Sequence, residues 1–194
     1  MTIILGWAAI VLGFFSYAFY FRDIFRGRTK PNSTTRLIWS FLNTFIFIQQ
    51  VAHGGGPGAW VTGLAAVANI AIFFLSLRHG EQKTTRFDWF CLIMAFLVLA
   101  VWLLTTSAEL AVVLASSVFV IGLIPTIRNS RIHVSEETAI SYGLNSAKFF
   151  LALFALSNVT LVTALYPVVL CIANGLFFAY LFSRQVSFRR TESE

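Results

Sequence analysis

The sequence predicts an all-helical integral membrane protein whose chain crosses the bilayer seven times. The first observation is composition: 58% of the 194 residues are hydrophobic and only 11% are charged, whereas soluble domains carry charges at about a quarter of their positions. The second observation is that seven apolar segments are each long enough to cross a hydrocarbon core of ~30 Å as a helix. The third is that basic residues occur only in every second connection between these segments.

The seven segments are expected to be helices. Strands are not expected, because the segments show no sustained alternation and barrel strands have only about 10 residues. Unpaired backbone groups are costly in lipid, so a single spanning segment must be helical. Residues 1–21 lack a basic start and run directly into RDIFRGR, so they are expected to span rather than to be a cleaved signal peptide. The predicted helices cover residues 3–21, 36–54, 57–77, 88–105, 107–126, 137–156 and 160–183.

The orientation follows from the basic residues in the connections. Lys and Arg occur in the first, third and fifth connections and in the tail from Arg184 onward, whereas HGGGPG, TTSAE and LSNVT contain none. Because basic connections remain in the cytoplasm, we expect the N-terminus outside and the C-terminus inside. Arg36, at the start of the second segment, is counted with the first basic connection. Lys148 is the only basic residue that this pattern leaves unexplained.

The chain contains an internal repeat. SFLNTFIFI in the second segment aligns with YGLNSAKFF in the sixth, which pairs Asn43 with Asn145. AVANIAIFF in the third aligns with LCIANGLFF in the seventh, which pairs Asn69 with Asn174. Two tandem three-helix bundles are parallel only if one more helix separates them, and the apolar segment 88–105 serves as this linker. The predicted units are a first three-helix repeat (1–84), a linker helix (85–106), a second three-helix repeat (107–184) and a cytoplasmic tail (185–194).

At these positions the chain resembles the SWEET and PQ-loop transporter superfamily. The resemblance covers nearly the whole chain and rests on the LNT and LNS triplets, on the two AN pairs and on PTIRNSRIHVSEET at 125–138. It implies a 3+1+3 arrangement of helices and a central substrate cavity that Asn69 and Asn174 line. The chain departs from the family in lacking the PQ dipeptide. Pro125 alone has a counterpart among the four hinge prolines of the plant branch, and it is the expected hinge or gate.

The candidates for substrate binding lie near the middle of the predicted helices. Amide groups offer both donors and acceptors, which suits polyols and carboxylates alike. Two phenylalanines stand where the family often has tryptophan and would form apolar walls, with ordinary packing as the alternative. For the asparagines of the second and sixth segments, hydrogen bonds between helices are the alternative. The candidates are Asn43, Phe47, Asn69, Asn145, Lys148, Phe149 and Asn174.

Lys148 lies near the centre of its predicted helix, where a lysine costs roughly 2.5–3.5 kcal/mol to insert. Such a residue normally faces the interior of a bundle, and the sequence places no acid at the same depth. Three interpretations remain open. Lys148 is a structural residue bonded to backbone carbonyls and hydroxyls, or it binds an anionic group of a substrate, or it is neutral and takes part in proton coupling.

The predicted function is transport of a small, sugar-like polar solute by alternating access without ATP, in the bacterial cytoplasmic membrane. One alternative is a carrier of a small carboxylate or amino acid that uses Lys148, and another is a non-transporting receptor or interaction protein on the same fold. An enzyme is not expected, because no nucleophile, nucleotide or metal motif occurs. The expected partners are the solute and the bilayer, with a homo-oligomer left open and with no cofactor, metal or nucleic acid.

Overall fold

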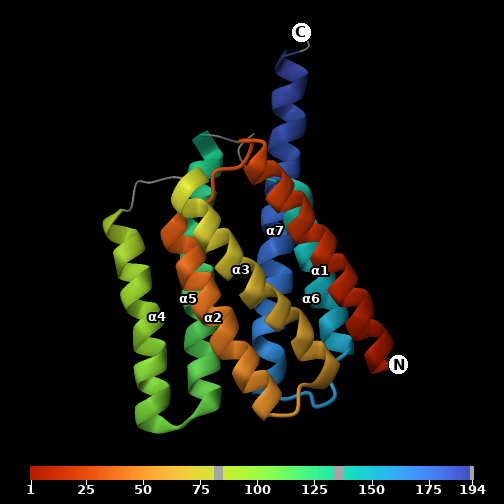
Figure 1. The fold of residues 1–194 in the computed structure, drawn as a ribbon, viewed down its shortest axis with the longest axis vertical. Coiled ribbons are helices and arrows are strands. Elements are labelled where there is room, and N and C mark those ends of the chain that lie inside the picture. The colour runs from red at the N-terminus through yellow and green to blue at the C-terminus, as the bar shows by residue number, and fades with distance from the viewer. Residues whose placement is uncertain (81–84, 133–137, 193–194) are drawn as a thin grey trace.

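The computed structural model describes residues 1–80, 85–132 and 138–192, and within them the chain forms seven α-helices and one short 3-10 helix (Figure 1). The predicted all-helical class is confirmed for these residues. The predicted boundaries lie within a few residues of the observed ones, except that two helices in the second half continue further. The elements are α1 (Thr2–Phe25), α2 (Ser33–Ala52), η1 (Gly56–Ala59), α3 (Trp60–His79), α4 (Arg86–Thr105), α5 (Ala108–Ile132), α6 (Ala139–Phe154) and α7 (Leu161–Glu192).

Local sequence explains where several helices begin. The side chain of Asn32 accepts a hydrogen bond from the backbone N–H of Thr35 at 2.9 Å, which caps the start of α2. Thr85 and Asp88 form a reciprocal capping box at the start of α4. Gly54, directly after α2, has a φ of +73°, a conformation that glycine adopts without the steric cost of a Cβ. The chain can therefore reverse tightly between α2 and η1.

Among the described residues, five helices are long and apolar enough to span a membrane: α1, η1 with α3, α4, α5 and α7. The two other helices are α2, whose buried face carries many polar side chains, and α6, which has 16 residues. Large apolar side chains such as Val67, Leu104 and Leu176 lie on the outside of the bundle. An apolar exterior around partly polar helices is the arrangement of an integral membrane protein.

The packing partners of the two halves correspond. α2 packs against α3 as α6 packs against α7, and α1 packs against α3 as α5 packs against α7. The halves meet where α1 contacts α6 and where α2 contacts α5. The counterparts in the two halves are α1 and α5, α2 and α6, and α3 and α7. When each helix is exchanged for its counterpart, the same pairs of helices remain in contact, as a twofold relation between repeats requires. α4 packs mainly against α5 and α2, at one edge of the bundle (Figure 1).

The halves are joined at the end of the bundle that holds the N-terminus. The backbone N–H of Gly58 donates to the carbonyl of Ala155 at 3.0 Å, and that of Ser157 donates to Gly55 at 3.2 Å. One helical turn deeper, the Gln50 side chain donates to the carbonyl of Thr163 at 2.8 Å. These bonds tie the α2–α3 connection to the α6–α7 connection and close this end.

The opposite end is closed by side chains. Thr138, before α6, donates to the Asp23 carboxylate at the end of α1 at 3.0 Å. The hydroxyls of Thr138 and Thr29 lie 2.9 Å apart, and Arg22 forms an ion pair with Asp23 at 2.9 Å. Asp23 is thus held by one basic and one hydroxyl partner where α1 meets the start of α6.

Replacing Gly58 with alanine should lower the melting temperature of the protein. A Cβ at this position would lie 2.6 Å from the carbonyl oxygen of Ala152 and 2.8 Å from the backbone nitrogen of Leu156. Overpacking against backbone of this kind costs about 1–3 kcal/mol. Thermal unfolding in detergent measures the change, with Gly122→Ala as the control, since only the Trp39 side chain, 3.3 Å away, faces that position. Equal melting temperatures for both variants would show that the backbone of Ala152 and Leu156 can shift to admit the added methyl group.

Candidate functional site

A polar cavity lies between the two halves of the bundle. The space open to the centre of a water-sized sphere is about 30 Å³, enough for one or two water molecules. Residues of α1, α2, α3, α5, α6 and α7 contribute to its wall, and none of the lining residues comes from α4. The polar and aromatic side chains that line it are Tyr17, Tyr20, Arg36, Trp39, Asn43, Asn69, Phe119, Ser141, Tyr142, Asn145, Phe149 and Asn174.

Asn69 and Asn174, which the repeat pairs, have the same local geometry. Each amide nitrogen donates to the carbonyl four residues earlier in its own helix, at 2.9 Å to Ala65 and at 2.7 Å to Leu170. The bond satisfies one donor and fixes the rotamer of the side chain, which leaves the amide oxygen for other partners. Both residues are buried and both line the cavity.

Asn43 repeats this geometry on α2, with its amide nitrogen donating to the carbonyl of Trp39 at 2.7 Å. Its side chain is 1% exposed, and its Oδ1 has no hydrogen-bond partner among the described residues. A buried carbonyl oxygen without a donor costs about 1–3 kcal/mol. The cavity therefore contains an acceptor that a bound molecule could satisfy.

Asn145 has a different environment from the other three asparagines. Its Oδ1 accepts from the Ser16 hydroxyl of α1 at 3.1 Å. The Ser16 and Ser141 hydroxyls lie 3.0 Å apart, and each also contacts the other's backbone carbonyl. Asn145 therefore joins the two halves at the wall of the cavity, which is the inter-helix hydrogen bonding considered for it above.

Arg36 is a cavity residue that the sequence pattern assigned to the first basic connection. Its side chain is buried, and Nη1 donates to Oδ1 of Asn69 at 3.3 Å. Nη2 donates to the hydroxyl of Tyr20. The guanidinium lies 4.5 Å from the centre of the Tyr20 ring and 4.9 Å from that of Trp39. The spacing in the sequence could have indicated that Arg36 lies at the cavity, because residues 36, 39 and 43 share one face of a helix.

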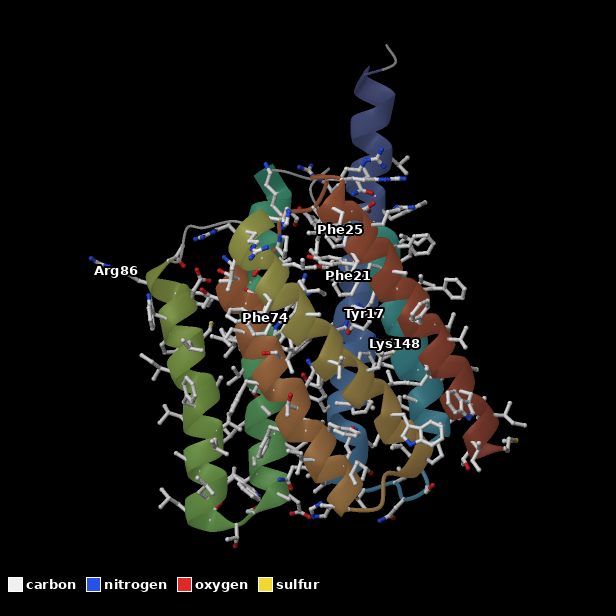
Figure 2. All side chains as sticks on the ribbon, viewed as in Figure 1. Tyr17, Phe21, Phe25, Phe74, Arg86 and Lys148 are labelled. Carbon is white, nitrogen blue, oxygen red and sulfur yellow. The ribbon has the colours of Figure 1, made fainter. Side chains whose placement is uncertain are left out.

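Lys148 is fully buried and is not among the residues that line the cavity. Figure 2 labels it close to Tyr17 of α1. Its Nζ is 4.0 Å from the centre of the Tyr17 ring and 5.0 Å from that of Phe149, and both rings line the cavity. No hydrogen-bond partner for Nζ is found within the described ranges. The absence of a side chain at Gly13 admits the lysine stem, since a Cβ there would lie 3.2 Å from its Cδ. Among the described residues, the Lys148 amino group thus contacts ring faces, and no carbonyl or hydroxyl bonds to it.

The remaining candidates from the sequence are placed as follows. Phe149 lines the cavity and is buried. Phe47 is not among the lining residues, and its ring packs on α3, where a Cβ at Gly63 would lie 2.9 Å from it. Pro125 lies within α5, and its side chain is outside the described part of the structure.

The cavity offers hydrogen-bond donors and acceptors, aromatic faces and one guanidinium, which are the groups of a binding site. No set of three metal-ligating side chains comes together in the described ranges. Comparison of the chain with family models, with curated proteins and with solved structures found no match. The function is therefore inferred from the fold and from the cavity.

Proposed function

We propose that the chain is a membrane transporter of the SWEET type that carries a small polar solute by alternating access without ATP. One observation carries the proposal: four asparagines paired by the internal repeat converge on a single cavity where the two halves meet. A binding site between repeats, near the middle of the helices, is the usual arrangement in transporters built from parallel repeats.

The proposed movement is a rocking of one half against the other. The α2–α3 pair and the α6–α7 pair pack extensively and would each remain together, while the α2–α5 interface and the α1–α6 interface, which is more extensive than that between α1 and α3, would change. Passage of a solute would require the Gly58–Ala155 bond to open at one end and the Asp23–Thr138 bond to open at the other, in turn. A cavity of about 30 Å³ is smaller than a sugar, so binding also requires opening.

The decisive experiment is solute flux into proteoliposomes that contain the purified protein. Labelled glucose, glycerol and lactate would be offered separately, with protein-free liposomes as the control. We expect saturable uptake of at least one solute, in either direction and without ATP. Saturable binding without any flux would instead favour a receptor on the same fold, and neither binding nor flux would contradict the proposal.

The proposed topology has seven spans, with the N-terminus outside and the C-terminus in the cytoplasm. In Figure 1 the N-terminus and the closed α2–α3 and α6–α7 connections lie at one end of the bundle, and the C-terminal part of α7 extends from the other. We expect a cysteine at Asn158 to react with a membrane-impermeant reagent added outside intact cells, and a cysteine at Ser183 to react only after permeabilisation. The reverse pattern would exclude this orientation.

A further inference from the structure

An apolar groove lies on the side of the bundle, where α5 packs against α7. The space in it that is open to the centre of a water-sized sphere is about 390 Å³, compared with about 30 Å³ for the polar cavity between the halves. α5 lines this lateral groove with Val120, Leu123 and Ile127, and α7 lines it with residues between Val169 and Tyr180. The hydroxyl of Tyr180 is the one polar side-chain group in this lining, so the lateral groove suits a hydrocarbon chain.

Two arginines continue the lateral groove toward the end of the bundle from which α7 extends. Arg131 follows Ile127 by four residues on α5, and Arg184 follows Tyr180 by four residues on α7. Residues four apart lie on the same face of a helix, so each arginine stands on the face that lines the lateral groove. Both side chains are exposed. The apolar lining is therefore followed by two positive charges.

The two arginines lie at a similar depth in the membrane. α5 and α7 begin at the same end of the bundle and run in the same direction (Figure 1). Arg131 and Arg184 each lie 23 residues after the first residue of their helices, Ala108 and Leu161, which is about 35 Å along a helix. The hydrocarbon core is ~30 Å thick. Both guanidinium groups are therefore expected just beyond the core, at the level of the lipid phosphates.

Neither of these arginines is neutralised by another described residue. Neither side chain forms an ion pair or a hydrogen bond within the described ranges, and Asp23, an acid at the same end, is engaged with Arg22 and Thr138. The orientation of a membrane protein explains basic residues at the cytoplasmic end, but it requires no particular face of a helix. Guanidinium groups bind phosphate through charge-assisted, often paired hydrogen bonds. Their position beyond an apolar groove fits a molecule with an anionic head and an apolar chain.

We propose that the lateral groove binds an anionic phospholipid, with an acyl chain along α5 and α7 and the phosphate between Arg131 and Arg184. Basic sites between membrane helices on the cytoplasmic side commonly hold anionic lipid head groups. Tyr180, one turn before Arg184, places its ring beside the chain and its hydroxyl toward the head group, as interfacial tyrosines do. The inference concerns a different surface from the polar cavity and does not depend on transport.

The first test is native mass spectrometry of ligand binding to the purified protein in detergent. Dioleoylphosphatidylglycerol has both the chains and the negative charge, dioleoylphosphatidylcholine has the same chains without net charge, and glycerol 3-phosphate has the phosphate without chains. We expect phosphatidylglycerol to bind at least about tenfold more tightly than either of the others. Equal binding of the two phospholipids would overturn the inference. Binding of glycerol 3-phosphate as tight as that of phosphatidylglycerol would also overturn it, because the ligand would then be a free phosphate compound.

Replacing Arg131 and Arg184 together with glutamine should abolish the preference for phosphatidylglycerol over phosphatidylcholine. The matched control replaces Arg78 and Arg86 with glutamine, which lowers the net charge by the same amount through exposed arginines of α3 and α4 at the same end of the bundle. Figure 2 shows Arg86 at the outer side of α4, away from α7. The control should keep the preference. An equal loss in both double variants would mean that binding follows the net charge of the protein, which contradicts a site at the lateral groove.

Filling the lateral groove tests the place of the acyl chain separately. The side chain of Leu176 lines the lateral groove and is 69% exposed, so Leu176→Trp adds volume there without overpacking the core. We expect this variant to bind phosphatidylglycerol severalfold more weakly than the wild type does. Val67→Trp is the control, because Val67 is 67% exposed on α3 and does not line the lateral groove. Phosphatidylglycerol binding by Leu176→Trp as tight as that of the control would show that the chain lies elsewhere and would refute the assignment.

Discussion

Solute uptake should fall to background when either Asn69 or Asn174 is replaced by alanine. Each amide lines the cavity, and each is oriented by a bond to its own helix. Asn69 is held further by Arg36, so both side chains have a fixed orientation at the cavity wall. Losing a preorganised amide at a buried site costs at least about tenfold in affinity, and a transporter needs the contact in every state of its cycle. Asn69→Ala also removes the acceptor that holds Arg36, so it should be the more severe of the two.

Uptake into proteoliposomes measures this effect, and thermal unfolding in detergent separates it from misfolding. A polar contact between membrane helices contributes about 0.6 kcal/mol on average, so both variants should still fold. Ser117→Ala is a suitable control, because Ser117 is exposed on α5 and bonds only to the carbonyl of Val113 in its own helix. Wild-type uptake by both asparagine variants would refute the assignment of the cavity as the transport site.

Lys148→Met should stabilise the protein and at the same time impair uptake of anions. A lysine at the centre of a membrane helix costs roughly 2.5–3.5 kcal/mol, and its contacts with the Tyr17 and Phe149 rings return about 2 kcal/mol when desolvated. Methionine fills similar volume without the charge, so the melting temperature should rise by about 2–4 °C for each kcal/mol gained. Lactate uptake should fall about tenfold, because a positive charge beside the cavity is lost.

The Lys148 test is specific because it combines two measurements that should change in opposite directions: the melting temperature should rise and lactate uptake should fall. Arg28→Met is the control, since Arg28 is an exposed basic residue in the connection between α1 and α2 and the loss of its charge should change neither quantity. A lower melting temperature for Lys148→Met would mean that the ammonium stabilises the fold and that its burial is structural. Unchanged lactate uptake would mean that the charge has no part in binding.

The convergence of the asparagines could be predicted because it depends on the repeat. Asn43 and Asn145, like Asn69 and Asn174, occupy matching positions in two aligned helices, and a symmetric pair of bundles brings matching positions to the shared interface. The sequence could not predict that Asn145 would bond to Ser16, because that contact depends on how closely α1 approaches α6.

Arg36 and Phe47 illustrate what remained beyond the sequence. Arg36 stands at the start of a helix, where a basic residue usually orients the protein. Its long side chain instead extends along the bundle to Asn69, and only packing determines that direction. Phe47 shares a helix with Asn43, but its ring is placed against Gly63 of α3. The neighbouring helices decide which face of an apolar helix lines a cavity, and the composition of the helix does not predict that face.

The length of α7 has a practical consequence for imaging the protein. Its 32 residues form a continuous helix of about 48 Å at 1.5 Å per residue, longer than the hydrocarbon core of ~30 Å, and the helix extends beyond the bundle (Figure 1). A helical soluble domain fused in register with α7 after Val186 would be joined through rigid backbone. The fusion would add a feature outside the detergent micelle that single-particle cryo-electron microscopy can align, which a particle of 21.7 kDa lacks on its own.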